Sequence, residues 1–333
     1  MRMDGEIKAQ LVSIGSADME ESLMMDVLGT TVPSAGPGAG IKSFFISSGG
    51  RRVRLSFNKK SPLKVMRAVP AGPEVVVIKD GVEIVRGEIE PALSHCPEQA
   101  YLTLSGRCIY DCKYCPVPKL QGEVKSLEKL VELVKDANKE GMLKAISLTS
   151  GVEKSPEDEV KKAVEVVKAL KARYDVPLGV SVYPTETSSE ELYDAGAREI
   201  KYNVETMDPE IFSQVCPGLS LPFILKALEK AVGIYGKDKV SSNFIIGLGE
   251  SDECVQKGVK TLAKMGVIPI LRPISPHPLR TGEIYVERPT AERLLKLVRF
   301  TKEVLEENNL RTDLAETMCL RCTGCDLTPQ RDV

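Results

Sequence analysis

Three cysteines within eight residues constrain this chain more than any other feature of its sequence. They are Cys108, Cys112 and Cys115, and they follow a strand-like run from Gln99 to Gly106. Thiols on one short loop do not easily form disulfides with one another, whereas three converging thiolates suit a metal. Gaps of three and two residues between them leave a four-iron cluster one ligand short. The spacing therefore predicts an iron–sulfur site with an open iron that a second molecule can bind.

Composition narrows the class of protein around this site. The chain has 333 residues, 42% hydrophobic and 28% charged, as in soluble globular proteins. A net charge of −2 argues against nucleic acid as a partner. We find neither a long apolar run nor a signal peptide, so we expect no membrane partner and a cytoplasmic location. Nine cysteines, an odd number, indicate reduced ligands, and two histidines argue against a His-rich metal site.

Residues 1–95 are predicted to form a small β-rich region. The Asp80-Gly81 pair joins two strand-like runs and is typical of a tight hairpin. Thr30 to Gly40 is rich in glycine and predicts a flexible loop. Packing and substrate recognition both stay open as roles for this region. Its predicted strands are Lys42–Ser47, Arg52–Phe57, Glu74–Lys79 and Val82–Val85.

From about residue 97, strand and helix patterns alternate. Ser155 before Pro156 is a well-formed helix start, with a cap followed by an N1 proline. Six such units predict a parallel sheet with helical crossovers, and six rather than eight predicts an open, partial (βα)6 barrel of the TIM type. The predicted strands are Gln99–Leu104, Lys144–Leu148, Leu178–Val182, Glu199–Val204, Val240–Ile246 and Val267–Leu271. The predicted helices are Ser126–Lys139, Pro156–Tyr174, Ser188–Ala195, Pro222–Tyr235, Asp252–Met265 and a last one from Thr290 to about Asn309.

Polar residues and glycines follow the end of each predicted strand. Because ligands of such folds bind at the carboxyl ends of the strands, these residues predict one shared site. They include the cysteine loop after the first strand, Ser150 and Gly151 after the second, Asn203 and Glu205 at the fourth, Gly247 to Glu250 after the fifth and Arg272 at the sixth.

The alternative for the cysteine loop is a structural zinc site, but zinc wants four ligands and no further Cys or His follows closely. A CxxxCxxC loop after the first strand of a βα repeat, with Tyr114 before the third cysteine, resembles the radical S-adenosylmethionine (SAM) superfamily. The resemblance covers about residues 97 to 280. It implies a [4Fe–4S] cluster whose open iron binds SAM, and an electron that cleaves SAM to a 5′-deoxyadenosyl radical.

The resemblance also implies contacts to SAM. Ser150 and Gly151 occupy the glycine-containing loop that meets the methionyl group, in a form similar to the biotin synthase and lipoyl synthase branch. Tyr202 to Thr206 is similar to a stretch of those synthases, which makes Asn203 and Glu205 expected contacts. Asn243 to Glu250 resembles a fifth-strand glycine motif, with Asn243 in place of its first glycine. Tyr114 and Arg272 complete the expected cofactor-binding residues. Arg272 is equally a candidate for binding a substrate carboxylate or for an ion pair at the mouth of the barrel.

A second set of closely spaced cysteines lies near the C-terminus, at Cys319, Cys322 and Cys325. We predict that they bind a second [4Fe–4S] cluster, because two-residue gaps are those of ferredoxin-type loops. A zinc knuckle is the alternative. The fourth ligand stays open among Cys96, Cys216, Cys254, another residue, and an external sulfur or substrate atom.

Together these features predict three regions: residues 1–95, the partial barrel at 96–285, and a helix with a cysteine-rich tail at 286–333. The branch resemblance implies sulfur insertion into C–H bonds of an octanoylated carrier protein, with the second cluster as sulfur donor. It implies ferredoxin or flavodoxin as electron donor, and a lipoyl carrier protein and a second radical SAM subunit as partners. The alternatives are cofactor maturation or peptide modification with an auxiliary cluster, and a non-catalytic iron–sulfur scaffold.

Overall fold

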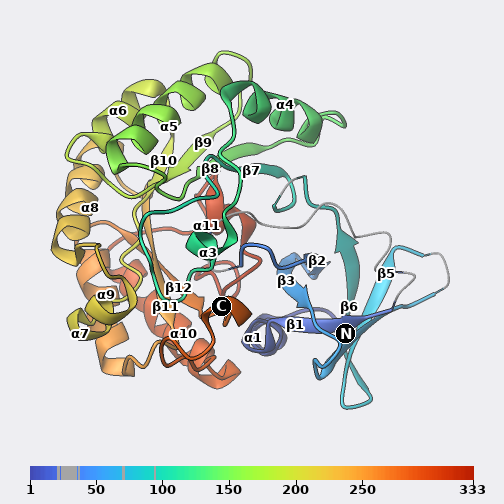
Figure 1. Ribbon diagram of the computed structural model, residues 1–333. Coiled ribbons are helices and arrows are strands. Elements are labelled where there is room, and N and C mark those ends of the chain that lie inside the picture. The colour runs from blue at the N-terminus through green and yellow to red at the C-terminus, as the bar shows by residue number, and fades with distance from the viewer. Residues whose placement is uncertain (21–22, 24–35, 37, 70–71, 94) are drawn as a thin grey trace.

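The chain builds two six-stranded sheets that lie next to each other (Figure 1). This computed structural model describes every residue except 21–22, 24–35, 37, 70–71 and 94. The predicted loop Thr30–Gly40 therefore lies mostly outside the described residues. Within the described part, no helix is long and apolar enough to cross a membrane.

The first sheet is a closed barrel with the strand order β1-β3-β2-β6-β5-β4. The hairpin at Asp80-Gly81 is confirmed, and both residues have a positive φ, as a primed turn requires. Two strands, β1 and β4, were not predicted, and their parallel pairing closes the barrel. The strands are β1 Ser16–Met19, β2 Ser43–Ser48, β3 Arg51–Phe57, β4 Leu63–Arg67, β5 Glu74–Lys79 and β6 Val82–Glu90.

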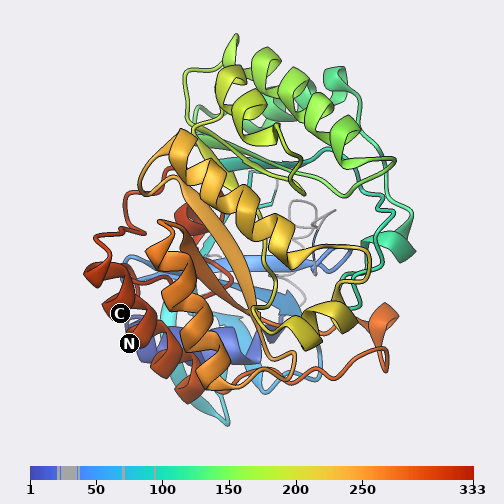
Figure 2. The ribbon, with the colours of Figure 1, turned by 90° about the vertical axis from the view of Figure 1, so that its left-hand side faces the viewer.

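The second sheet is parallel throughout, with the order β12-β11-β10-β9-β8-β7. This confirms the predicted partial barrel of six strands in chain order. Helices cover its outer face (Figure 2). The strands are β7 Gln99–Thr103, β8 Ala145–Thr149, β9 Leu178–Ser181, β10 Glu199–Lys201, β11 Val240–Ile246 and β12 Ile268–Pro273.

The helices between these strands begin at local capping signals. Ser155 accepts a hydrogen bond from the backbone N–H of Asp158, which confirms the predicted start of α5. Asp208 caps α7, a short helix that was not predicted although Pro209 marks its first turn. The helices are α3 Val117–Leu120, α4 Leu127–Ala137, α5 Pro156–Lys171, α6 Ser188–Ala195, α7 Pro209–Val215, α8 Leu221–Tyr235, α9 Asp252–Lys264 and α10 Ala291–Glu307, with a 3-10 turn η1 at Pro278–Arg280.

Strand β10 is shorter than predicted, because side chains replace the backbone ladder after Lys201. The backbone N–H of Val204 donates to the Ser242 hydroxyl at 2.9 Å, and that of Asn243 donates to Asn203 Oδ1 at 3.2 Å. The prediction that the strand reaches Val204 is therefore wrong. The ladder resumes at Glu205, whose backbone N–H donates to the Asn243 carbonyl oxygen at 3.0 Å and whose carbonyl oxygen accepts from the N–H of Ile245 at 2.7 Å. The pairing with β11 is therefore interrupted only between Lys201 and Glu205.

The two sheets are joined by both ends of the chain. Helix α1 Gly5–Ile14 contributes Leu11 to a hydrophobic core that it shares with the barrel strands and with Leu294 and Val298 of α10. Lys8 in α1 is fully buried, and its Nζ contacts Asp332 Oδ2 at 2.6 Å and the carbonyl oxygen of Thr323 at 2.7 Å. This pair ties the first helix to the C-terminal tail.

Candidate active site

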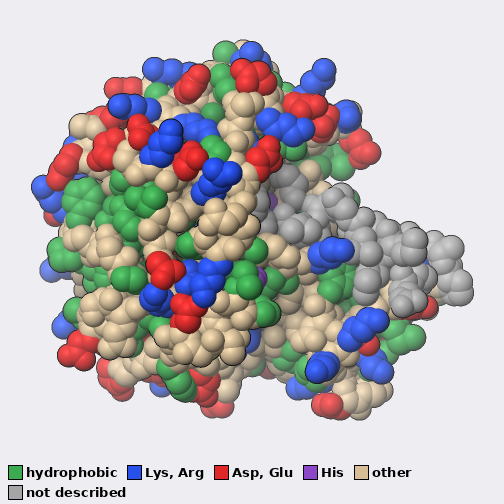
Figure 3. All heavy atoms as spheres, in the orientation of Figure 1, with side chains coloured by type: hydrophobic (Ala, Val, Ile, Leu, Met, Phe, Trp, Pro, Cys, Tyr) green, Lys and Arg blue, Asp and Glu red, His purple; other side chains and the backbone are tan. Residues whose placement is uncertain are grey.

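A cavity of about 650 Å³ lies at the carboxyl ends of the parallel strands. Its walls come from all six of these strands or the loops that follow them, and residues of the N-terminal barrel, among them Ser16, Ser43 and Arg54, close one side. On the face of the molecule shown in Figure 3, charged side chains of both signs are spread over the surface. The lining itself contains five cationic side chains and, among the described residues, one carboxylate: Arg54, Lys125, Lys201, Arg272, Arg288 and Glu205.

All but one of the residues predicted to bind SAM or the two clusters line this cavity. They are Cys108, Cys112, Tyr114, Cys115, Ser150, Gly151, Asn203, Glu205, Arg272, Cys319 and Cys325. The exception is Cys322, which is buried behind the cavity wall. The fifth-strand motif also ends outside the cavity, because the Glu250 carboxylate accepts hydrogen bonds from the backbone of Gly247 and Leu248 and pairs with Arg293.

The first cysteine loop is closed at its base and fixed at its tip. At the base, the backbones of Gly106 and Gly122 approach so closely that a Cβ on either would lie within 3.1 Å of the other. At the tip, Arg280 donates to the carbonyl oxygen of Cys115 at 2.7 Å and pairs with Asp111 at 2.6 Å. Arg280 was not predicted as a site residue, since its role depends on a contact across 165 residues.

Gly151 brings the second-strand loop against the cysteine loop. A Cβ at this position would lie 2.2 Å from the carbonyl oxygen of Arg107, so only glycine fits without a shift. The next residue, Val152, directs its backbone N–H at the sulfur of Cys108, at 3.5 Å. Such N–H groups stabilise a thiolate or a cluster sulfur.

The hydroxyl of Ser150 is engaged in supporting this loop. It donates to Glu159 Oε2 at 2.6 Å and accepts from the backbone N–H of Ser105 at 3.1 Å. The other oxygen of Glu159 accepts from the backbone of Glu153 at 3.1 Å. Glu159 lies in the first turn of α5 and is buried, so it is a site-supporting residue that the sequence pattern did not reveal.

Glu205 has an unusual backbone and an unusual carboxyl group. Its φ is +59°, a strained value for a residue with a side chain, and a parallel bridge to Phe244 holds it there. Burial raises the pKa of this carboxyl to about 7, although hydrogen bonds with Tyr114 and Asn203 favour its ionised form. Strain combined with a perturbed pKa is common at functional sites.

The second cysteine set reaches the cavity from inside the partial barrel. Helix α11 Met318–Cys322 enters the concave side of the sheet, where Gln99 of β7 and Ser147 of β8 form hydrogen bonds with the backbone of Met318. Gly179 of β9 leaves room for Thr317, whose Oγ would lie 2.1 Å from a Cβ there. The residues that face this tail are therefore small or polar, unlike those of a filled hydrophobic barrel.

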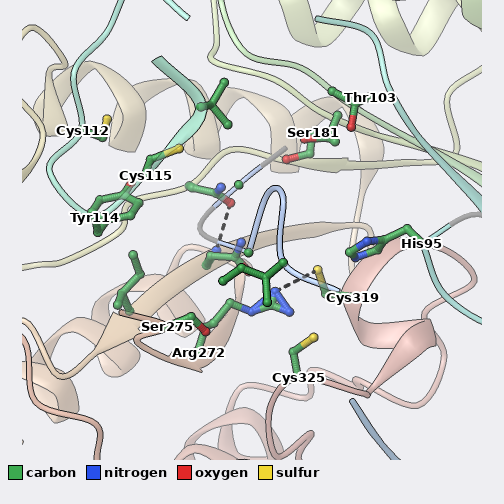
Figure 4. A pocket seen from close by; sticks show the side chains of 18 of the residues that line it. His95, Thr103, Cys112, Tyr114, Cys115, Ser181, Arg272, Ser275, Cys319 and Cys325 are labelled. Carbon is green, nitrogen blue, oxygen red and sulfur yellow. Dashed lines mark hydrogen bonds between the residues drawn. The ribbon is translucent and has the colours of Figure 1, made fainter. Parts of the chain in front are cut away.

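Cys319 and Cys325 face the cavity beside cationic groups. Lys201 Nζ lies 3.2 Å from the sulfur of Cys319, and Arg272 Nη1 lies 3.6 Å from it. Burial lowers the pKa of Lys201, but its charge and hydrogen-bond interactions with Cys319 and Tyr101 together raise this pKa. Figure 4 shows Cys112, Tyr114 and Cys115 on one side of the cavity, and Arg272, Cys319 and Cys325 on the other with His95. Lys201 and His95 were not predicted.

The donor atoms suit iron–sulfur clusters, because each set offers thiols at a shared cavity and backbone or cationic groups near their sulfurs. In the described part of the chain, no three Cys, His, Asp or Glu side chains already converge as a metal-binding group. Burial raises the pKa of Cys108, and raises that of Cys115 to about 12. The first set therefore holds protonated thiols that lose their protons on binding metal.

Comparison with known proteins agrees with this site. The family model of the radical SAM superfamily matches residues 102–262. A GTP 3′,8-cyclase of Sulfurovum sp. (strain NBC37-1) is 24% identical over 48% of this chain and 52% of its own length. A probable GTP 3′,8-cyclase of Pyrococcus abyssi (strain GE5 / Orsay) is 23% identical over 68% of this chain and 80% of its own. This chain spans about half of the length of the first relatives it matches.

Solved structures share the fold. The FeFe-hydrogenase maturase HydG from Carboxydothermus hydrogenoformans has a TM-score of 0.54 at 19% identity, covering 63% of this chain and 52% of that one. A radical SAM methyltransferase from Sphaerobacter thermophilus has a TM-score of 0.52 at 17% identity, covering 76% of each chain. The two curated relatives from Sulfurovum and Pyrococcus abyssi are named as GTP 3′,8-cyclases. The expected biotin synthase and lipoyl synthase branch is therefore not supported. The family match covers most of the partial barrel, and the radical SAM family that it describes implies a [4Fe–4S] cluster and SAM as cofactors.

Proposed function

We propose that this chain is a two-cluster radical SAM enzyme that acts on a C–H bond of a substrate bound between its two cysteine sets. The observation that carries this proposal is that Cys108, Cys112 and Cys115 line the same cavity as Cys319 and Cys325. Figure 4 shows Cys112 and Cys115 across the cavity from Cys319 and Cys325. When bound, the first cluster with SAM supplies a 5′-deoxyadenosyl radical, and the second cluster supplies sulfur.

The chain's own residues bind and position these groups. Cys108, Cys112 and Cys115 hold the first cluster, and Arg280 fixes their loop. Tyr114, Ser150, Gly151, Asn203 and Glu205 surround the space in front of that loop, where SAM binds. One further acceptor is available there, because Asn243 Oδ1 is buried without a hydrogen-bond partner among the described residues. An amide oxygen of this kind suits the amino group or ribose hydroxyls of SAM.

The reaction that we propose is sulfur insertion into an unactivated C–H bond, with an octanoylated carrier protein as substrate. It is supported by the position of the second cysteine set, which places sulfur on the wall of the substrate cavity. Ferredoxin or flavodoxin is the proposed electron donor. A lipoyl carrier protein and a second radical SAM subunit are the proposed partners.

The test is anaerobic incubation of the reconstituted, reduced enzyme with SAM and an octanoyl–lysyl peptide, followed by mass analysis. We expect 5′-deoxyadenosine together with a peptide that has gained sulfur. A peptide that stays unchanged while 5′-deoxyadenosine accumulates, with the partner subunit also present, would contradict sulfur insertion. Absence of 5′-deoxyadenosine with every substrate tried would contradict the radical mechanism and favour a non-catalytic scaffold.

A second candidate is cyclisation of a purine nucleoside triphosphate, which the names of the curated relatives suggest. The charge of the cavity favours it, because Arg54, Lys125, Lys201 and Arg272 could neutralise phosphate groups. The same incubation with GTP in place of the peptide tests it. A cyclised product of GTP would establish this reaction and rule out sulfur insertion as the main activity.

A further inference from the structure

The nine cysteines of the chain fall into two groups of four and a single residue. Around the first loop, the buried Cys216 places its Sγ 3.9 Å from the Tyr114 hydroxyl. Around the tail, Cys96 packs in one small buried cluster with Cys322. Cys254 lies apart from both groups, in the first turn of α9. The sequence left the fourth ligand of the second cluster open, and this grouping narrows the choice.

Cys96 and Cys322 share a small buried core behind the cavity. Both side chains are buried and pack with Phe45 of β2 and with Ala92. Cys322 is the member of the C-terminal set that turns away from the cavity. A cluster that is bound by Cys319, Cys322 and Cys325 must therefore extend from the cavity wall toward this core. Cys96 is the thiol that it meets there.

Several contacts hold the segment around Cys96 against α11. Gln99 Nε2 donates to the Met318 carbonyl oxygen at 3.2 Å. Arg52 Nη1 donates to the Cys322 carbonyl oxygen at 3.2 Å and its Nη2 lies 3.6 Å from Glu98. Glu98 also lies 3.8 Å from Arg321 of α11. The two segments, more than 200 residues apart in sequence, are therefore positioned together before any cluster binds.

The C-terminal loop is fixed from its other side as well. Thr323 has a φ of +57° and ends α11, and the following Gly324 accepts a backbone hydrogen bond from Arg54 at 2.7 Å. Arg54 also places its Nη1 3.9 Å from the sulfur of Cys325. This turn directs Cys325 back to the cavity, while Cys319 and Cys322 lie one helical turn apart on α11.

We propose that Cys96 is the fourth ligand of the second cluster, with Cys319, Cys322 and Cys325 as the other three. This inference rests on the proposed function, which assigns a cluster to the tail. Four thiolates give a [4Fe–4S] cluster a negative charge, and Arg52, Arg54, Lys201 and Arg272 surround it as counter-ions. All its irons are then occupied, so substrate binds near the second cluster and not to one of its irons. The first cluster, with three cysteine ligands, keeps one iron open for SAM, whereas the second has no open iron.

His95 is the competing ligand, because it neighbours Cys96 in sequence and lines the cavity. Its ring packs against Tyr101 with the ring centres 5.1 Å apart. Thiolates are the usual ligands of [4Fe–4S] clusters, and the thiol that contacts the C-terminal set is that of Cys96. The structure therefore favours Cys96 over its neighbour.

The test begins from a parent variant in which Cys108, Cys112 and Cys115 are replaced by Ala, so that only the second cluster can form. After anaerobic reconstitution, we expect about four irons per chain in this parent. Adding Cys96→Ala should leave a cluster that loses its fourth iron on mild oxidation, with about three irons and the EPR signal of a three-iron cluster. Cys96→Ser is the second variant, and its oxygen ligand should retain iron with an altered spectrum. His95→Ala, Cys216→Ala and Cys254→Ala are the matched controls and should keep the parent spectrum.

The outcomes separate the inference from the proposed function. A Cys96→Ala variant that folds, by circular dichroism, and keeps four irons with the parent spectrum would overturn Cys96 as a ligand. Loss of the fourth iron in His95→Ala but not in Cys96→Ala would overturn the assignment of Cys96 and identify His95 as the ligand. A parent that binds zinc or no metal would overturn the second cluster, and the proposed function with it.

Discussion

The two cysteine sets of this protein are built in opposite ways. The first is local, because Cys108, Cys112 and Cys115 lie on one loop directly after β7. The second depends on the whole fold, since α11 is held by strands of the sheet, by Lys8 of the first helix and by Arg52 and Arg54 of the N-terminal barrel. A local set can be recognised from its spacing alone. A set assembled over long range can be disrupted from many distant positions.

The largest expected effect separates the two sets by activity. Replacing Cys108, Cys112 and Cys115 by Ala should abolish formation of 5′-deoxyadenosine, because no cluster remains to bind SAM. Replacing Cys319, Cys322 and Cys325 by Ala should leave SAM cleavage in place and remove the final product. Chromatography of 5′-deoxyadenosine and mass analysis of the substrate measure both. Loss of SAM cleavage in the second variant as well would show that the two sets do not act separately.

Breaking the buried pair of Lys8 should affect only the second set. Lys8→Met removes the nearest cation from the buried Asp332 carboxylate and leaves it Arg51 at 3.9 Å and the backbone N–H of Thr328, so we expect a loss of about 3 kcal/mol in the free energy of unfolding. The amount of iron bound by the C-terminal cysteines should fall, while the amount bound by the first cysteine loop should stay the same. Urea unfolding and iron analysis measure these, with the exposed Lys60→Met as control. Equal loss of iron from both sets would contradict the long-range origin of the second.

Glu205 provides a pH test that concerns the first set. In the metal-free folded protein the pKa of its carboxyl is about 7, above the ordinary 4.5. The folded state therefore binds this proton more tightly than the unfolded chain does. The protonated Glu205 carboxyl contributes fully to the free energy of unfolding below pH 4.5, and this contribution is lost as pH rises to about 7. Glu205→Gln should remove up to about 3 kcal/mol of this pH dependence. Urea unfolding of both proteins across this range measures it, and parallel curves would contradict the raised pKa.

The smallest effect is expected at Gly179, beneath the tail. A Cβ there would lie 2.1 Å from Thr317 Oγ, so Gly179→Ala should displace the start of α11 at a cost of about 1–3 kcal/mol. The cluster of the tail should bind less tightly, with the first one unchanged. Gly233→Ala in α8 is the control, because nothing lies within 4 Å of its Cβ position, and it should be neutral or slightly stabilising. Thermal unfolding and iron content compare the two.

Sequence reasoning succeeded where the signal was local. The strands of the parallel sheet, the Asp80-Gly81 turn and the Ser155 cap each depend on neighbouring residues, and each is confirmed. The strand-end rule also placed Ser150, Gly151 and Asn203 at one cavity before any contact was known. Their proposed roles toward SAM follow from that position and from the superfamily.

Sequence reasoning failed where residues far apart in the sequence come into contact. Nothing near Cys322 in sequence indicates that it turns toward Cys96, and nothing near Lys201 predicts that a lysine can be buried beside a thiol. The end of β10 was missed because Asn203 and Ser242 replace backbone hydrogen bonds with side-chain ones. Strand β1 has only four residues, and in β4 the exposed Met66 adds an apolar residue on the polar face, which obscures the alternating pattern.

The most direct test of the two-set account is the iron content of the reconstituted wild-type protein beside the two triple Cys→Ala variants. If each cysteine set holds its own four-iron cluster, the wild type should contain about eight irons per chain and each variant about four. About four irons in the wild type, with zinc bound to the tail and no iron left in the variant of the first loop, would contradict the account.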